Sequence, residues 1–184
     1  MWAARPTRYA GRSSSARRPA AKPETRFLVR FAAFLAASYL AVAVKPANDH
    51  VIVPFTERIV GVSTSVLRAV GEPAVASGTR ITSPSFAVDV KNGCNGVEAM
   101  LILLAAVLAF PAPWRSRLAA LAAGALVIQM LNLVRVVSLF WLGAHHREVF
   151  DLFHTAVWQT LLILTAVGLF VLWSRRVRGR GARA

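Results

Sequence analysis

The stretch Asn92-Gly93-Cys94-Asn95-Gly96-Val97-Glu98 joins a polar segment to a long apolar one, and it contains the only cysteine of the chain. Two glycines flank the thiol, so the backbone can turn tightly there and leave Cys94 accessible. Asn95, followed three residues later by Glu98, predicts a capping box with Asn95 as N-cap. We therefore expect a helix to begin just after Cys94, where the helix dipole favours the thiolate. The alternative is a small cysteine used only for packing.

Outward from this stretch, apolar residues collect in four blocks, at about 27–44, 97–110, 118–143 and 153–173. Three of them approach or exceed the ~17–25 residues that a membrane-spanning helix needs. The block at 97–110 reaches that length only if its helix begins near Asn95 and runs to Pro111. Buried helices of a soluble protein would carry polar faces, and these blocks have almost none. The sequence predicts an all-α integral membrane protein with four transmembrane helices.

The net charge of +14 is distributed unevenly along the chain. The two ends of the chain and the loop 111–117 hold one acidic residue, Glu24, and fifteen basic ones: Arg5, Arg8, Arg12, Arg17, Arg18, Lys22, Arg26, Arg30, Arg115, Arg117, Arg175, Arg176, Arg178, Arg180 and Arg183. The rest of the chain holds seven basic and seven acidic residues. The positive-inside rule assigns the basic face to the cytoplasm. The alternative, a basic RNA-binding tail, lacks interleaved aromatic residues, so we expect a lipid bilayer and no nucleic acid as partner.

These patterns divide the chain into three parts. Residues 1–26 are expected to be a disordered basic cytoplasmic tail, residues 27–173 a four-span membrane domain, and residues 174–184 a second basic cytoplasmic tail. Ala41-Val42-Ala43 has the small-x-small character of a signal-peptide cleavage site, so cleavage of the first span is an alternative to an uncleaved anchor.

The segment between the first two blocks predicts an outer amphipathic helix and a small β-hairpin. The helix would begin at Pro54 and end at Gly71-Glu72-Pro73, with apolar residues at steps of three and four: Phe55, Ile59, Val62, Val66 and Val70. Gly78 and Ser83-Pro84-Ser85 are typical of turns, and the alternation from Phe86 to Val90 is typical of a strand. The hairpin would lead directly into Cys94.

Three chemically distinct groups are predicted to reach the same height in the bilayer. Arg135 lies 18 residues after Arg117, or ~27 Å along its helix, and His154 lies 19 residues before Trp173, or ~28 Å. Cys94 precedes the second span on the same face. A thiolate nucleophile, a histidine acid/base and a permanently charged guanidinium together suit acyl transfer.

Each of these residues also has a simpler interpretation. Arg135 could only pair with lipid, although a charge within a span is usually functional, and Asn132 one turn away would be its hydrogen-bond partner. His154 could be an interfacial residue bonded to Asp151, which is expected near the N-cap of the last span. Glu98 would serve mainly as the capping residue. The pair His145 and His146 is expected in a solvated turn, and the spacing supports neither a metal site nor a cofactor.

Three motifs in order resemble those of the exosortase/archaeosortase family of membrane cysteine transpeptidases. They are Asn-Gly-Cys-Asn-Gly, then Asn-Leu-Val-Arg at 132–135, then His154 at the start of the final span. The approach through Phe86-Ala87-Val88 and the Phe110-Pro111 pair look most like exosortase H. The resemblance covers roughly residues 27–173.

The resemblance implies a cysteine peptidase/transpeptidase with sortase-like chemistry in the bacterial inner membrane. Its substrates would be exported proteins with a C-terminal sorting signal, made of a short motif, a hydrophobic span and a basic tail. For the H type that motif is expected to be Ile-Pro-Thr-Leu-x-x-Trp-Gly. Cleavage would occur on the outer, periplasmic face, and an anchor whose acceptor nucleophile is unknown would receive the acyl group. Cys94 would be the nucleophile, Arg135 the electrophilic stabiliser and His154 the acid/base.

Two other functions fit the same residues. One is a non-catalytic membrane assembly subunit, in which Cys94 would be unreactive and replaceable. The other is a thiol-dependent membrane acyltransferase, which would carry a lipid-derived acyl group on Cys94. Asn132, Asn95, Glu98 and Asp151 are the expected supporting residues in the enzymatic interpretation.

Overall fold

The computed structural model describes residues 22–181, so most of the predicted N-terminal tail, residues 1–21, lies outside the described residues. Helix α1 (Pro23–Ala43) is followed by a continuous helical segment made of α2 (Lys45–Ala47), the π-helical turn η1 (Asn48–Ile52) and α3 (Val53–Ala69). A small sheet leads to α4 (Val97–Ala109) and α5 (Trp114–His145). The last helical segment comprises α6 (Arg147–Leu152), the π-helical turn η2 (Phe153–Val157) and α7 (Trp158–Gly181).

Among residues 22–181, three helical segments are long and apolar enough to cross a membrane: Pro23–Ala43, Trp114–His145 and Arg147–Gly179. The prediction of a fourth span is not confirmed. Helix α4 begins at Val97 and ends at Ala109, because the backbone becomes extended at Phe110 just before Pro111. Its 13 residues extend only about 20 Å, against a hydrocarbon core of about 30 Å.

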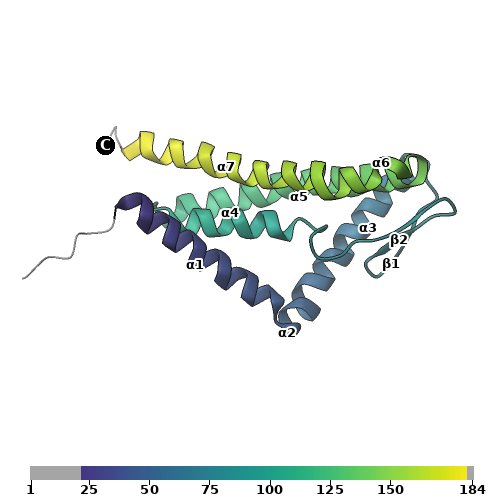
Figure 1. Cartoon of the computed structure of the whole chain (residues 1–184), viewed down its shortest axis with the longest axis horizontal. Coiled ribbons are helices and arrows are strands. Elements are labelled where there is room, and N and C mark those ends of the chain that lie inside the picture. The colour runs from purple at the N-terminus through teal and green to yellow at the C-terminus, as the bar shows by residue number, and fades with distance from the viewer. Residues whose placement is uncertain (1–21, 182–184) are drawn as a thin grey trace, which may run out of the picture.

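Helix α4 nevertheless returns the chain toward the end at which α1 begins. It packs against α1, α5 and α7, and both described ends of the chain lie at the same end of the bundle (Figure 1). There, Phe110 contacts the rings of Phe170 and Trp173, and Phe27 stacks on Phe170. We call this aromatic region, with the arginines around it, the basic end, and the opposite region the Cys94 end.

The predicted hairpin is part of a larger sheet at the Cys94 end. Strands β1 (Val75–Ser77), β2 (Arg80–Thr82) and β3 (Ala87–Asp89) pair antiparallel in the order β1-β2-β3. The predicted turns at Gly78 and at Ser83-Pro84-Ser85 connect them. Ile81 is fully buried and packs with Val60, Leu67 and Phe140, so the sheet covers α3 and α5.

Helix α3 exists as predicted, but the apolar stripe that predicted it is not its buried face. Its buried residues are Thr56, Val60, Ser63, Thr64 and Leu67, whereas Val62 and Val70 of the apolar stripe are exposed. Apolar side chains of a membrane protein can face lipid, and small hydroxyl residues allow helices to approach closely. The stripe therefore identifies the helix without identifying its inner face.

Candidate functional site

The loop before α4 holds Cys94 in a tight turn. The Cys94 N–H donates to the Lys91 carbonyl at 2.9 Å, and Gly93 and Gly96 adopt φ values of +93° and +77°. These are left-handed conformations, which glycine adopts without steric cost. The thiol is partly buried, and it faces α5 and η2 rather than open solvent.

Asn95 fixes this loop, although the predicted capping box does not form. The N-cap of α4 is Gly96, one residue later than predicted, and no side-chain cap bond is made to it. Instead, Asn95 Oδ1 accepts from the Val97 N–H at 3.1 Å, and Asn95 Nδ2 donates to Thr56 Oγ1 at 3.0 Å. Asn95 is fully buried, so it ties the Cys94 loop to α3.

Helix α5 supports the loop from the other side. Gln129 Nε2 donates to the Asn95 carbonyl at 3.3 Å. A Cβ atom added at Gly96 would lie 2.9 Å from Gln129 Nε2 and 3.2 Å from Asn132 Cγ, so α5 passes directly over the glycine backbone. The polar residues Gln129 and Asn132 of α5 therefore pack on the segment that carries the thiol.

Arg135 is the central cation of this region, with only 2% of its surface exposed. Its Nη1 donates to the Gly93 carbonyl at 3.2 Å and to Gln159 Oε1 at 3.3 Å, while Nη2 donates to the His154 carbonyl at 3.3 Å. Nη2 also lies 3.9 Å from Cys94 Sγ. Within residues 22–181, no carboxylate lies within 4.0 Å of this guanidinium.

The predicted hydrogen bond between Asn132 and Arg135 is absent. Asn132 is fully buried, and neither atom of its amide has a hydrogen-bond partner within the described part of the chain. Residues three apart on a helix lie on neighbouring parts of one face, but the Arg135 side chain extends away toward Gly93 and Gln159. Asn132 thus contacts the loop at Gly96 instead of the guanidinium.

His154 approaches the thiol from η2. Its Nε2 lies 3.5 Å from Cys94 Sγ and its Nδ1 lies 4.0 Å from the same atom. The ring stacks on Phe150 with a centroid separation of 5.5 Å and an interplanar angle of 7°. The stacking keeps the imidazole in the plane from which it contacts sulfur.

Asp151 does not have its predicted position. The helix that carries His154 begins at Arg147 with His146 as N-cap, so Asp151 lies inside α6. Its carbonyl accepts from Thr155 Oγ1, and its exposed carboxylate forms no ion pair within 4.0 Å among the described residues. The predicted N-cap failed because α6 extends the helix one turn further toward its N-terminus.

The electrostatic environment of Cys94 differs from the predicted one. Burial raises the pKa of the Cys94 thiol, and the Glu98 carboxylate raises it further. The Arg135 guanidinium and the Lys91 backbone hydrogen bond act in the opposite direction, but they do not outweigh burial. The resting group is thus predominantly a thiol near neutral pH, and a base must take its proton before it can attack as thiolate.

Glu98, like Arg135, lies close to Gly93. Its Oε1 would lie 3.7 Å from a Cβ atom at Gly93, and its side chain lines a cleft of about 190 Å³ together with Tyr39, Val42 and Asn92. A second cavity of about 20 Å³, large enough for about one water molecule, lies directly at the thiol. It is lined by Cys94, Arg135, His154, Phe150, Leu139, Val136 and the β3 region from Val88 to Val90.

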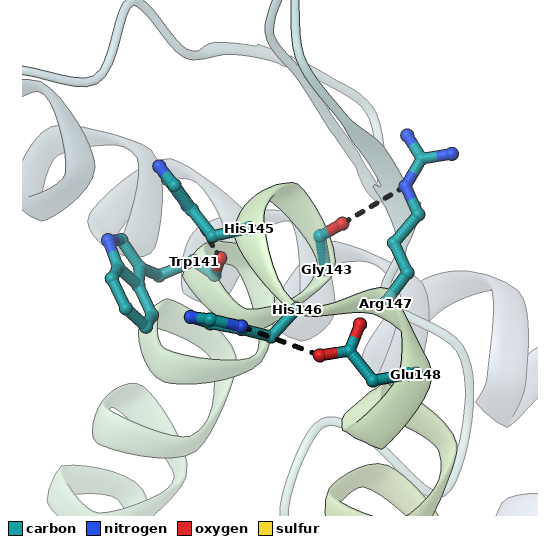
Figure 2. A network of polar contacts seen from close by, with 6 residues as sticks. All are labelled: Trp141, Gly143, His145, His146, Arg147 and Glu148. Atoms are coloured by element: carbon teal, nitrogen blue, oxygen red, sulfur yellow. Dashed lines mark hydrogen bonds and ion pairs between the residues drawn. The ribbon is translucent and has the colours of Figure 1, made fainter.

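The predicted solvated turn at His145 and His146 joins α5 to α6, as Figure 2 shows. His145 Nδ1 lies 2.9 Å from the Trp141 carbonyl, and its ring stacks on Trp141. His146 Nδ1 lies 3.5 Å from Glu148 Oε1, and Arg147 Nε donates to the Gly143 carbonyl (Figure 2). These contacts stabilise the turn and leave both rings exposed at its surface.

Gln159 is a polar side-chain contact of Arg135 that the sequence analysis did not predict. It lies five residues after His154, a spacing that places two residues on different faces of an α-helix. In the π-helical turn η2 the backbone bonds link residues five apart, as the Trp158 N–H does with the Phe153 carbonyl. A polar residue within a span was the available signal.

The fold and the site together define a membrane protein in which a single thiol, an imidazole and a buried guanidinium meet at one end of a helical bundle. A family model described as transmembrane exosortase (Exosortase_EpsH) matches residues 23–173, and the chain belongs to this family. No curated protein and no solved structure matches the chain.

Proposed function

We propose that the chain is a cysteine peptidase/transpeptidase of the exosortase H type. It cleaves the C-terminal sorting signal of exported proteins and transfers the acyl group to an anchoring acceptor. Its membrane is the bacterial inner membrane, with both termini in the cytoplasm and Cys94 on the periplasmic side. One observation carries the proposal: Cys94, Arg135 and His154 come from three separate segments, and both partners lie within 4.0 Å of the sulfur.

The geometry supports a definite sequence of proton and bond changes. His154 takes the proton from Cys94 Sγ, and the thiolate attacks the carbonyl carbon of the scissile bond. Arg135 stabilises the oxyanion that forms as the C–S bond is made. His154 then returns the proton to the leaving amine as the C–N bond breaks, which leaves a thioester on Cys94. An acceptor nucleophile attacks this thioester and regenerates the thiol.

Within residues 22–181, no carboxylate lies within 4.0 Å of the Arg135 guanidinium, which favours this function over a purely structural one. A buried charge is costly unless another group compensates it. Around Arg135 the compensation comes from neutral oxygens and from the sulfur, so a positive charge remains available to a thiolate or an oxyanion. A structural arginine of an assembly subunit would be expected to pair with a carboxylate.

The test co-expresses the chain with an exported protein that carries the sorting signal. The size of that exported protein is compared in the presence of wild type, Cys94→Ala and Cys94→Ser. We expect wild type to shorten the substrate and Cys94→Ala to leave it intact, although the variant inserts and accumulates normally. Processing by Cys94→Ala at the wild-type rate would refute the proposal. A lipid-derived acyl mass on Cys94, without substrate cleavage, would support the acyltransferase instead.

A further inference from the structure

The hydrogen-bond acceptors around the Arg135 guanidinium have an unusual composition. Two are backbone carbonyls, of Gly93 and His154, and the third oxygen is the side-chain amide of Gln159. The two backbone carbonyls stay neutral whichever residues carry them. Gln159 Oε1 is therefore the only one of these three oxygens whose charge a substitution can change. A glutamate at this position would have nearly the same shape and would form an ion pair with the arginine.

The backbone of the last helical segment brings Gln159 to Arg135. The π-helical turn η2 covers Phe153–Val157, and its hydrogen bonds join residues five apart. His154 and Gln159 are five apart, so this turn brings them closer to one face than an α-helix would. Both then contact the same guanidinium, His154 through its carbonyl to Nη2 and Gln159 through Oε1 to Nη1.

We propose that Gln159 is a positioning residue for Arg135: it fixes the guanidinium plane beside Cys94 while leaving the positive charge uncompensated. The inference rests on the proposed function, in which that charge stabilises a thiolate and an oxyanion. An amide acceptor orients Nη1 without cancelling the charge, whereas a carboxylate would cancel it. An apolar residue would leave a buried donor unsatisfied and the side chain less fixed.

The experiment measures the rate of Cys94 alkylation by iodoacetamide as a function of pH, in the full chain purified in detergent. Cys94 is the only cysteine, so the modified mass reports on one thiol. Gln159→Glu should move the pH midpoint upward, because a compensated Arg135 stabilises the thiolate less. Each unit of this rise slows alkylation at pH 7 about tenfold. Gln159→Met should give a smaller upward shift, and Thr160→Val, on the exposed neighbour, should give none.

The double variant separates positioning from a direct effect on sulfur. In an Arg135→Gln background, Gln159→Glu should no longer move the midpoint, because its effect passes through the arginine. A shift that persists there, or single variants that all stay within twofold of wild type, would overturn the inference. The readout needs no substrate. Failure of sorting-signal processing would therefore refute the proposed function and leave this measurement interpretable.

Discussion

The basic end and the site around Cys94 hold arginine in opposite ways. At the basic end, arginines lie over aromatic rings: the Cζ atom of the exposed Arg178 is 5.2 Å from the ring centroid of Phe110, and that of the half-buried Arg117 is 5.9 Å from the Trp114 ring. At the Cys94 end, Arg135 is buried and held by fixed carbonyls and an amide. We expect the several arginines of the basic end to replace one another, whereas Arg135 is held in one orientation beside the thiol.

The strongest test of this contrast is Arg135→Lys, which preserves the charge and removes the planar fork. Lysine cannot donate at once to the Gly93 carbonyl, the His154 carbonyl and Gln159 with the same geometry. We expect processing of a sorting-signal substrate to fall about 10²–10³-fold, the usual effect of losing an oxyanion-stabilising donor.

The control for Arg135→Lys is Arg178→Lys at the basic end, where a point charge over a ring keeps most of its attraction. The measurement is the initial rate of substrate shortening at equal amounts of inserted protein. A near-normal rate in Arg135→Lys would show that charge alone suffices and would remove the contrast between the two ends.

The next test concerns backbone packing beside the thiol. Gly96→Ala should lower the free energy of unfolding by about 2–4 kcal/mol, because alanine is strained at φ +77° and its Cβ would lie 2.9 Å from Gln129 Nε2. Gly179→Ala, near the basic end, meets nothing within 4 Å and should have little effect or slightly stabilise α7. Thermal unfolding in detergent measures both. Equal stability of the two variants would indicate that the Cys94 loop can adjust its backbone.

Features that depend on composition and spacing could be predicted from the sequence, and features that depend on tertiary packing could not. Apolar blocks and glycine-flanked Cys94 depend on composition and spacing, so the long helices, the turns and the shared level of the thiol, guanidinium and imidazole were accessible. The inner face of α3 was not, because in a membrane protein an apolar face can point to lipid. Gln159 was not predicted because the π-helical turn η2 changes which residues share a face of the helix. No pattern of residues in the sequence predicts such a turn.

A smaller effect is expected from the acidic neighbour of the thiol. Because the Glu98 carboxylate contributes to the raised pKa of Cys94, Glu98→Gln should lower that pKa. At pH 7, below the midpoint, more thiolate is then present, and alkylation should speed up severalfold, reaching about tenfold if the pKa falls by a full unit. At high pH both proteins should react at the same rate. Glu57→Gln, on the exposed side of α3, should leave the profile unchanged. An unchanged profile in Glu98→Gln would mean that the Glu98 carboxylate does not contribute to the raised pKa of Cys94.

The smallest effect should come from removing one charge at the basic end. Arg178→Gln loses the contact with Phe110, which is worth about 0.5–1 kcal/mol at an exposed position. Arg175 and Arg176 remain on the same helix, so insertion and Cys94 alkylation should match wild type, with only a slight fall in the unfolding midpoint. Arg175→Gln is the matched control without a ring contact. Loss of membrane insertion in Arg178→Gln, but not in Arg175→Gln, would contradict this expectation. It would show that Arg175 and Arg176 cannot replace the charge of Arg178.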